Sequence, residues 1–147
     1  MAFVVYASFS WGQQTEDDIR KEASKLFEQK EYVQATPLFL HLLSLNPKDA
    51  GYNFKYGACL LFNSNQKNEG LRYLNYAVKE GGIDPRAFYF RGKALHLDYQ
   101  FDKAIKSYET YYAKVGSNED EQYGVSRQID MCRNGKKLLT TFTDIIV

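Results

Sequence analysis

The sequence predicts an all-α fold: a right-handed solenoid of three helical hairpins, a capping helix after them and a short β-like tail. Three observations predict this. Apolar residues recur at spacings of three and four along most of the chain. Small residues recur with a period of 34 or 35 residues, and only 3 prolines and 10 glycines interrupt the 147 residues. Such a period is typical of stacked helix pairs, because one pair cannot bury its apolar face alone.

The period is carried by small residues at two separate positions of the repeat. The first position is occupied by Ala23, Gly57 and Gly92, and the second by Ala35, Gly70 and Ala104. A large side chain at the point where two helices cross would hold their backbones apart. We therefore expect these six residues at the three crossings, with aromatic side chains filling the remaining volume of the core.

The first hairpin has clear start and stop signals. Thr15 is suited to cap a helix, and the three acidic residues that follow it favour the positive end of the helix dipole. The polar run 28–31 predicts the turn, and Tyr32 begins the second helix. That helix is expected to end at Asn46-Pro47, because the residue before a proline avoids helical dihedral angles.

The second and third hairpins repeat the arrangement. We expect their four helices at about 49–62, 67–80, 85–98 and 101–115. Gly81-Gly82 predicts the end of the second of these helices, and Asp84-Pro85 predicts the start of the third. Glycine is favoured just after a helix C-terminus and proline in a first helical turn.

A capping helix is predicted after Gly116. It is expected to start at Ser117 or Asn118 and to end at Asn134-Gly135. A solenoid needs such a helix because the last hairpin otherwise exposes its apolar face. The hairpins and the cap together predict one domain over residues 15–135.

The tail predicts a different structure. Residues 138–147 are rich in β-branched and aromatic side chains and carry one charge, at Asp144. A helical array offers no sheet for such a strand to join. Segment 136–147 is therefore expected to be the start of a following β domain or an extended tail.

The hairpins resemble the tetratricopeptide repeat (TPR). The first matches through Tyr32-x-x-Ala35-x-x-x-Phe39 and a closing Pro47, and the third through Gly92-x-x-Leu95 and Phe101-x-x-Ala104-x-x-x-Tyr108. The second hairpin departs most, with a longer turn, glycine at position 70 and an inserted Gly81-Gly82-Ile83. The resemblance covers about residues 16–115. It implies a scaffold that holds a protein or peptide in its concave groove.

The N-terminal segment 1–14 has its own pattern. Residues 2–11 are uncharged and mostly apolar or small, and Ser10-Trp11-Gly12 follows at their end. This resembles the apolar core and cleavage site of a secretory signal peptide, although no Lys or Arg precedes the apolar run. The alternative is an apolar extension of the domain.

The order of repeats, cap and strand resembles a Bacteroidetes-type family of envelope proteins. In that family a TPR domain precedes a β-propeller and an OmpA-like domain, and one branch belongs to type IX secretion. The resemblance implies a periplasmic, outer-membrane-associated protein that contacts a partner or the downstream domains of its own chain. The alternative is a free-standing cytosolic TPR adaptor or co-chaperone.

Composition and motifs exclude several function classes. With 19 Lys and Arg against 18 Asp and Glu, the chain lacks the basic excess of nucleic-acid-binding proteins, and no apolar run is long enough to span a membrane. No nucleophile, metal or phosphate-binding motif surrounds His41 or His96, so we expect no enzyme activity, metal or cofactor. Cys59 and Cys132 are expected to be buried free thiols, with a disulfide as the alternative.

The first helices of the hairpins are expected to line the groove. Their groove-facing candidates are Arg20, Ser24, Phe54, Ala58, Arg86, Tyr89, Lys93 and His96. Cations beside aromatic rings suit a peptide with carboxylates and an apolar anchor. Arg20 and Arg86 fall where TPR domains with a chaperone-tail carboxylate clamp have basic residues. Ser24 and Lys55 stand where that clamp has asparagines, so the clamp pattern is incomplete.

Overall fold

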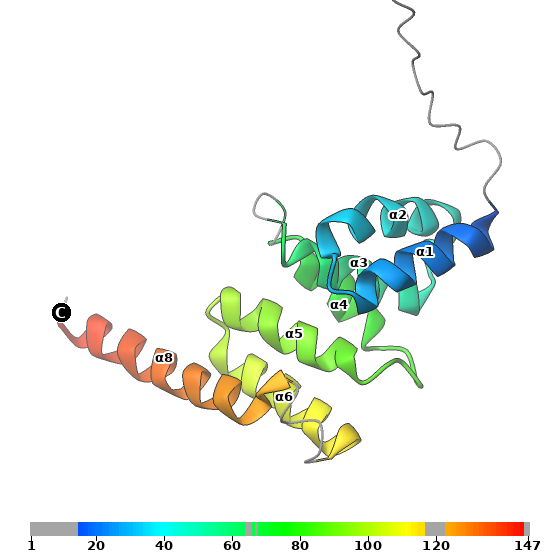
Figure 1. Ribbon diagram of the computed structural model, residues 1–147. Coiled ribbons are helices and arrows are strands. Elements are labelled where there is room, and N and C mark those ends of the chain that lie inside the picture. The colour runs from blue at the N-terminus through cyan, green and yellow to red at the C-terminus, as the bar shows by residue number, and fades with distance from the viewer. Residues whose placement is uncertain (1–14, 64–65, 67, 117–122, 146–147) are drawn as a thin grey trace, which may run out of the picture.

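The computed structural model describes residues 15–63, 66, 68–116 and 123–145. This part of the chain contains no strand and forms seven helices: α1 (Glu16–Glu28), α2 (Tyr32–Leu45), α3 (Ala50–Leu60), α4 (Gly70–Ala77), α5 (Arg86–Leu97), α6 (Phe101–Val115) and α8 (Val125–Ile145). Helices α1 and α2, α3 and α4, and α5 and α6 pack as hairpins, and α8 covers α6 (Figure 1). The predicted all-α solenoid of three hairpins with a helix over its last face is confirmed.

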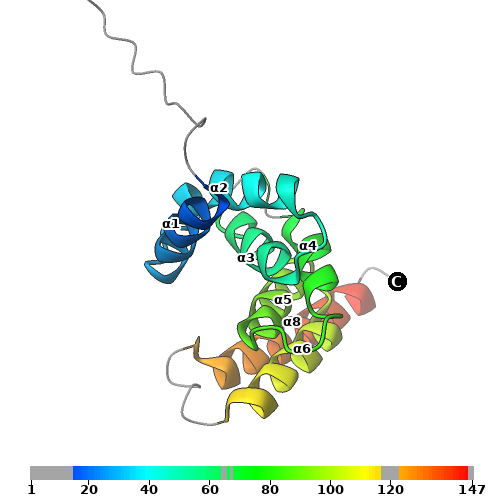
Figure 2. The ribbon, with the colours of Figure 1, turned by 90° about the vertical axis from the view of Figure 1, so that its right-hand side faces the viewer.

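The hairpins follow a curve. Figure 2 shows α1, α3 and α5 on the inner side of this curve and α2, α4 and α6 on the outer side. We call the inner surface formed by α1, α3 and α5 the concave face. None of the described helices combines the length and apolarity that crossing a bilayer requires.

Local signals set the first helix start and the inner turns of the first and third hairpins. Thr15 forms the predicted cap, because its hydroxyl accepts from the Asp18 N–H while the Asp18 carboxylate accepts from the Thr15 N–H. The turns of these hairpins place Lys30 and Tyr99 at φ 62° and 57°. Both are non-glycine residues in the left-handed region, and both allow the next N–H to bond five residues back, to Leu26 and Leu95.

Of the six small residues, the three glycines lie against the paired helix of their hairpin, as predicted. The three alanines are fully buried. A Cβ added to Gly57 would lie 2.9 Å from the carbonyl oxygen of Gly70, and one added to Gly70 would lie 2.6 Å from that of Gly57. A Cβ added to Gly92 would lie 2.7 Å from the ring of Tyr108. Larger residues at these positions would push the paired helices apart.

The core runs through all three hairpins. Phe27 of α1, Phe54 of α3 and Phe90 of α5 meet with ring centroids 5.6 to 6.0 Å apart. Each first helix therefore contributes one ring to a cluster beneath the concave face. Such ring contacts stabilise the array beyond the area that they bury, by about 0.5–1.5 kcal/mol per pair.

The predicted end of the cap at Asn134-Gly135 and the predicted strand are both wrong over the described residues. Helix α8 continues through Gly135 to Ile145; the predicted start at Ser117 or Asn118, the segment 1–14 and residues 146–147 lie outside the described residues. Gly135 does not end the helix, because it lies against the Phe101 ring, where an added Cβ would approach to 2.6 Å.

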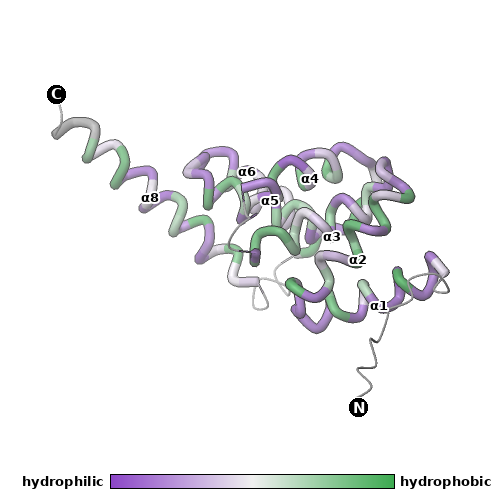
Figure 3. Tube along the Cα trace, turned by 90° about the horizontal axis from the view of Figure 1, so that it is seen from above, coloured by the Kyte–Doolittle hydropathy of each residue, from purple (hydrophilic) through white to green (hydrophobic). Residues whose placement is uncertain are grey.

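The C-terminal part of α8 forms helix in spite of its β-branched residues. The hydroxyls of Thr140 and Thr141 donate to the carbonyls of Lys136 and Lys137, four residues back, as helical threonines do. Figure 3 shows this part of α8 leading away from the other helices. Its Leu138 and Phe142 side chains are accordingly exposed.

Candidate functional site

Three of the predicted groove residues lie beneath the concave face and not on it. Phe54 is 1% exposed and belongs to the ring cluster of the core, and Ala58 is fully buried. Tyr89 is 7% exposed and packs against Tyr108, Tyr111 and Tyr123. Because other side chains cover them, these three residues belong to the core under the concave face and present almost no surface to solvent.

Arg86 is already paired within the chain. Its guanidinium donates to both carboxylate oxygens of Glu28 at 2.8 and 3.0 Å and to Asp84 at 2.7 Å. The hydrogen bonds that Arg86 donates to these two carboxylates raise the pKa of Arg86. The predicted role of Arg86 as a ready carboxylate binder is corrected by this geometry: the side chain ties α5 to α1, across the second hairpin.

The same contacts act on the two carboxylates. The hydrogen bond from Arg86 lowers the pKa of Glu28 below its ordinary value. Burial alone would raise the pKa of Asp84, but the hydrogen bonds from the side chain and backbone N–H of Arg86 outweigh it, and this pKa is lowered as well. Both carboxylates are therefore charged at neutral pH.

Lys55 lies beside this group and was not among the predicted site residues. Its ammonium donates to Ser24 Oγ at 3.1 Å and lies 5.9 and 5.8 Å from the ring centroids of Phe27 and Phe39. Burial lowers the pKa of Lys55. One signal in the sequence marks it, since Lys55 is the one charged residue in the eleven residues of α3.

Arg20 lies at the outer end of α1. It forms an ion pair with Asp17, one turn before it, and this carboxylate raises the pKa of Arg20. Eight residues separate Arg20 from Glu28, which is about 12 Å along a helix. Arg20 is exposed and does not join the group around Arg86, and its predicted place in the binding groove stays a prediction.

The second half of α5 holds the other predicted pair, Lys93 and His96. Lys93 is half-buried, and its ammonium lies 5.2 Å from the centroid of the Phe62 ring. Burial lowers the pKa of Lys93, while burial and the nearby charge of Lys93 lower the pKa of His96. The two side chains are one helical turn apart and so share a face of α5.

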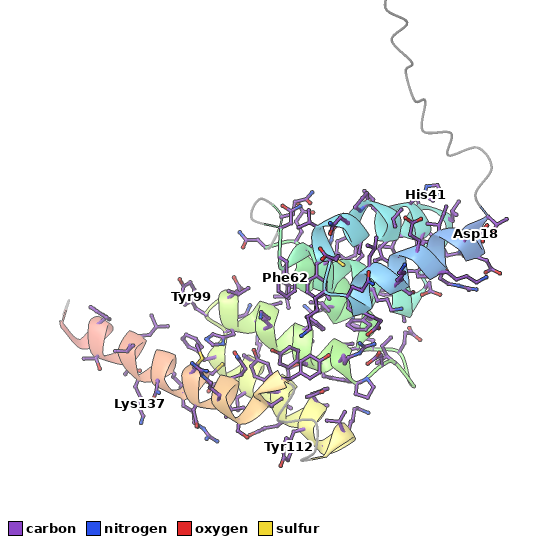
Figure 4. The ribbon with its side chains drawn as sticks, viewed as in Figure 1. Asp18, His41, Phe62, Tyr99, Tyr112 and Lys137 are labelled. Carbon is purple, nitrogen blue, oxygen red and sulfur yellow. The ribbon has the colours of Figure 1, made fainter. Side chains whose placement is uncertain are left out.

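Phe62 is a site residue that the sequence did not indicate. It follows the end of α3, is 40% exposed and stacks on Tyr32 with the ring centroids 4.1 Å apart and the planes 14° from parallel. Figure 4 shows Phe62 between the first two hairpins and α5. Burial raises the pKa of Tyr32 to about 12, so its hydroxyl stays neutral and can act as a hydrogen-bond donor.

The remaining groups that could ligate a metal or act as nucleophiles are histidine, cysteine and carboxylate side chains. Across the residues that the structure describes, no three His, Cys, Asp or Glu side chains gather closely enough to hold a metal ion. Cys59 and Cys132 are free and buried, as predicted. Burial raises the pKa of Cys59 to about 12 and that of Cys132 to about 11, so neither is a thiolate at neutral pH.

A hollow of about 430 Å³ lies elsewhere, between α6 and α8. It is lined by Glu109, Tyr112, Ala113, Ser126, Ile129, Asp130 and Arg133. None of these residues comes from α1, α3 or α5. The hollow follows from packing α8 over the last hairpin.

Solved structures share this arrangement of helices. The Yersinia enterocolitica type III secretion translocator chaperone SycD matches with a TM-score of 0.66 and 16% identity, over 85% of this chain and 90% of that chain. The chain has the fold of a TPR domain. The Sgt2 TPR domain of Aspergillus fumigatus matches with a TM-score of 0.65 and 19% identity, over 86% of this chain and 82% of that one.

A third similar structure is a peptide complex. The first TPR of Spaghetti (RPAP3), solved with the HSP90 peptide SRMEEVD, has a TM-score of 0.64 and 17% identity, over 85% of this chain and 93% of that chain. No family model and no curated protein sequence matches the chain. At these identities the TPR likeness establishes the fold of the chain and not its partner.

Proposed function

We propose that this chain is a non-catalytic protein-interaction scaffold that binds an extended peptide, or an extended segment of a partner protein, along its concave face. The observation that carries the proposal is the pair of half-buried lysines on neighbouring first helices, Lys55 on α3 and Lys93 on α5, each held over aromatic rings. Cations over rings offer both charge and apolar surface to a peptide.

Two of the similar structures support the proposal. SycD has been solved with a peptide of the translocator YopD, and the TPR of Spaghetti with an HSP90 peptide. The shared fold presents the same inner surface in this chain, formed by α1, α3 and α5 (Figure 2). Its side chains differ from the chaperone-tail clamp, because Ser24 and Lys55 replace the asparagines, and we therefore expect a different peptide.

Selection from a random peptide display library tests the proposal. Selected peptides should bind the purified chain and lose binding to the variant Ser24→Trp, which fills the space beside Lys55. The matched control is Leu40→Trp, at a position on α2 that is 51% exposed. Far-ultraviolet circular dichroism checks that both variants fold. Enrichment of no peptide, or equal binding to both variants, would contradict binding on the concave face.

We further propose that the chain works in the cell envelope, on the periplasmic side of an outer membrane, within a multidomain protein such as those of type IX secretion. The support is the signal-like pattern of residues 2–12. The tail no longer supports a following β domain, because residues 138–145 are helical. Contact with downstream domains of the same chain is the alternative to a separate partner.

Fractionation of the source cells, with N-terminal sequencing of the mature protein, tests this location. A mature protein that starts near Gln13 and collects in the envelope fraction is expected. A protein that keeps Met1 and stays in the cytosol would favour the free-standing adaptor or co-chaperone instead. This measurement is independent of the peptide-binding test, since location and binding surface can fail separately.

A further inference from the structure

The charged side chains of the concave face fall into two groups. In the first, the positive charges of Lys55 and Arg86 are opposed by the negative charges of Glu28 and Asp84. Two cations and two anions leave this group close to neutral. An incoming carboxylate would have to displace Glu28 from the guanidinium of Arg86, which holds it through two hydrogen bonds.

The second group is positive without an opposing charge. Among the ion pairs between residues that the structure describes, none involves Lys93. His96, one helical turn further along α5, adds positive charge near Lys93 when it is protonated. A half-buried ammonium has lost part of its hydration, so a counterion stabilises it more than it would a fully exposed lysine.

An apolar surface lies directly beside this ammonium. Phe62 contacts Lys93, stacks on Tyr32 and remains 40% exposed. The Phe62 ring is also braced by Phe90 of the core, with the two centroids 6.4 Å apart. The ring is therefore held in place by α2 and α5 and still presents apolar area to solvent.

We propose that Lys93 and Phe62 form the anion subsite of the concave face, where a carboxylate of the bound peptide pairs with Lys93 and a neighbouring apolar side chain packs on Phe62. This inference rests on the proposed peptide-binding function. It places the anion subsite at Lys93 in the second half of α5, whereas the sequence had indicated Arg86 and Lys93 alike. The occupant is an acidic peptide, because one lysine beside a ring matches one carboxylate beside an apolar side chain.

A phosphate group fits this subsite less well. A phosphorylated residue carries close to two negative charges and usually meets a cluster of arginines. Of the two arginines on α5, Arg86 is held by two carboxylates of the chain itself, and Arg91 donates to Asn75 and Ser107. A single carboxylate therefore complements the available charge better.

Fluorescence anisotropy with two sets of labelled octapeptides tests the subsite on the full chain. One set carries a Phe-Glu-Phe core among Gly, Ser and Ala, and the other carries Phe-Gln-Phe in its place. The glutamate set should bind about tenfold more tightly, as one charge-assisted hydrogen bond predicts. The difference should vanish in Lys93→Met, which keeps the aliphatic stem, and persist in Lys93→Arg.

The matched control is Lys114→Met. The ammonium of Lys114 lies 5.4 Å from the Phe88 ring and so reproduces the lysine-over-ring contact, but Lys114 is on α6, outside the concave face. This variant should bind both peptide sets as the original chain does. A second variant, Phe62→Ala, should weaken both sets, because it removes the apolar half of the subsite.

The outcomes separate this subsite from the proposed function. Equal binding of the two sets, or a Glu-over-Gln preference that survives in Lys93→Met, would overturn the subsite while the concave face stays the peptide site. Tighter binding of a phosphoserine set than of the glutamate set would overturn the carboxylate assignment. If neither set binds, the subsite is wrong, and the proposed function then depends on whether library peptides discriminate Ser24→Trp from Leu40→Trp.

Discussion

The second and third hairpins carry glycine at the same position of the repeat and use it for different contacts. In the second hairpin, Gly57 of α3 and Gly70 of α4 bring two backbones together, with no side chain between them. In the third, Gly92 of α5 makes room for the ring of Tyr108 on α6. This repeat position therefore requires a small residue in both hairpins. The residue that faces it on the second helix determines whether backbone or an aromatic ring occupies the space.

The largest effect is expected where backbone meets backbone. Gly70→Ala should lower the free energy of unfolding by about 3 kcal/mol, because the carbonyl of Gly57 cannot rotate away as a side chain can. The loss should appear although alanine favours a helix by about 1 kcal/mol over glycine. Urea denaturation measures it, and Gly81→Ala, where no atom lies within 4 Å of the added Cβ, is the control. Similar midpoints for Gly70→Ala and the original chain would show that α3 and α4 can separate freely.

A smaller effect is expected where backbone meets a ring. Gly92→Ala should lower the free energy of unfolding by about 1–2 kcal/mol, since Tyr108 has to shift. The loss should largely disappear in the background of Tyr108→Leu, which is the residue at the matching position 74 of the second hairpin. A double-mutant cycle by urea denaturation measures this coupling. Strict additivity of the two changes would mean that Gly92 and Tyr108 do not share the space.

The ring of the third hairpin also carries a buried hydroxyl without a partner. Tyr108 Oη has no hydrogen-bond partner among the described residues, and burial raises the pKa of Tyr108. Tyr108→Phe should therefore raise the free energy of unfolding by about 1 kcal/mol. The control is Tyr52→Phe, which removes a hydroxyl that donates to Glu16 and should lower stability by a similar amount. A loss of melting temperature in Tyr108→Phe would argue for a partner to this hydroxyl.

The smallest effect is expected from the charges that tie the third hairpin to the first. The pKa values of Glu28 and Asp84 are lowered in the folded chain, so unfolding takes up protons near their ordinary pKa values. Their contribution is complete above the ordinary carboxyl pKa of about 4 and is lost as the pH falls through the lowered values.

Glu28→Gln tests this contribution. It should lower stability at pH 7 by less than about 1 kcal/mol, because the pair is half-exposed, and the difference from the original chain should shrink towards pH 3. Urea midpoints between pH 7 and pH 3 measure it, with the exposed Glu80→Gln as control. A difference that stays constant over this pH range would contradict the role of the Glu28 charge.

On the concave face, the sequence predicts which residues share a helix but not which side chains pair with them. Arg86, Lys93 and His96 are correctly predicted on one helix, because residues three and four apart share a helical face. Their pairing is not predictable in this way. Arg86 meets Glu28, 58 positions earlier in the chain, and Lys93 meets Phe62 from the end of α3. Whether a cation is free or paired depends on side chains that only the stacking of hairpins brings near.

The sequence by itself determined the hairpins of this protein, and the tertiary structure decided the rest. The helix periodicity, the cap at Thr15 and the six small residues act over a few residues or repeat along the chain, and the α6 helix was predicted with its observed bounds of 101–115. Gly135 and the tail were misread because a local preference for a helix stop and a strand is weak beside packing on Phe101. Tertiary packing likewise determines which cation of the concave face has no opposing charge. Arg86 is brought beside Glu28, whereas Lys93 is brought beside Phe62, and both partners are far away in the sequence.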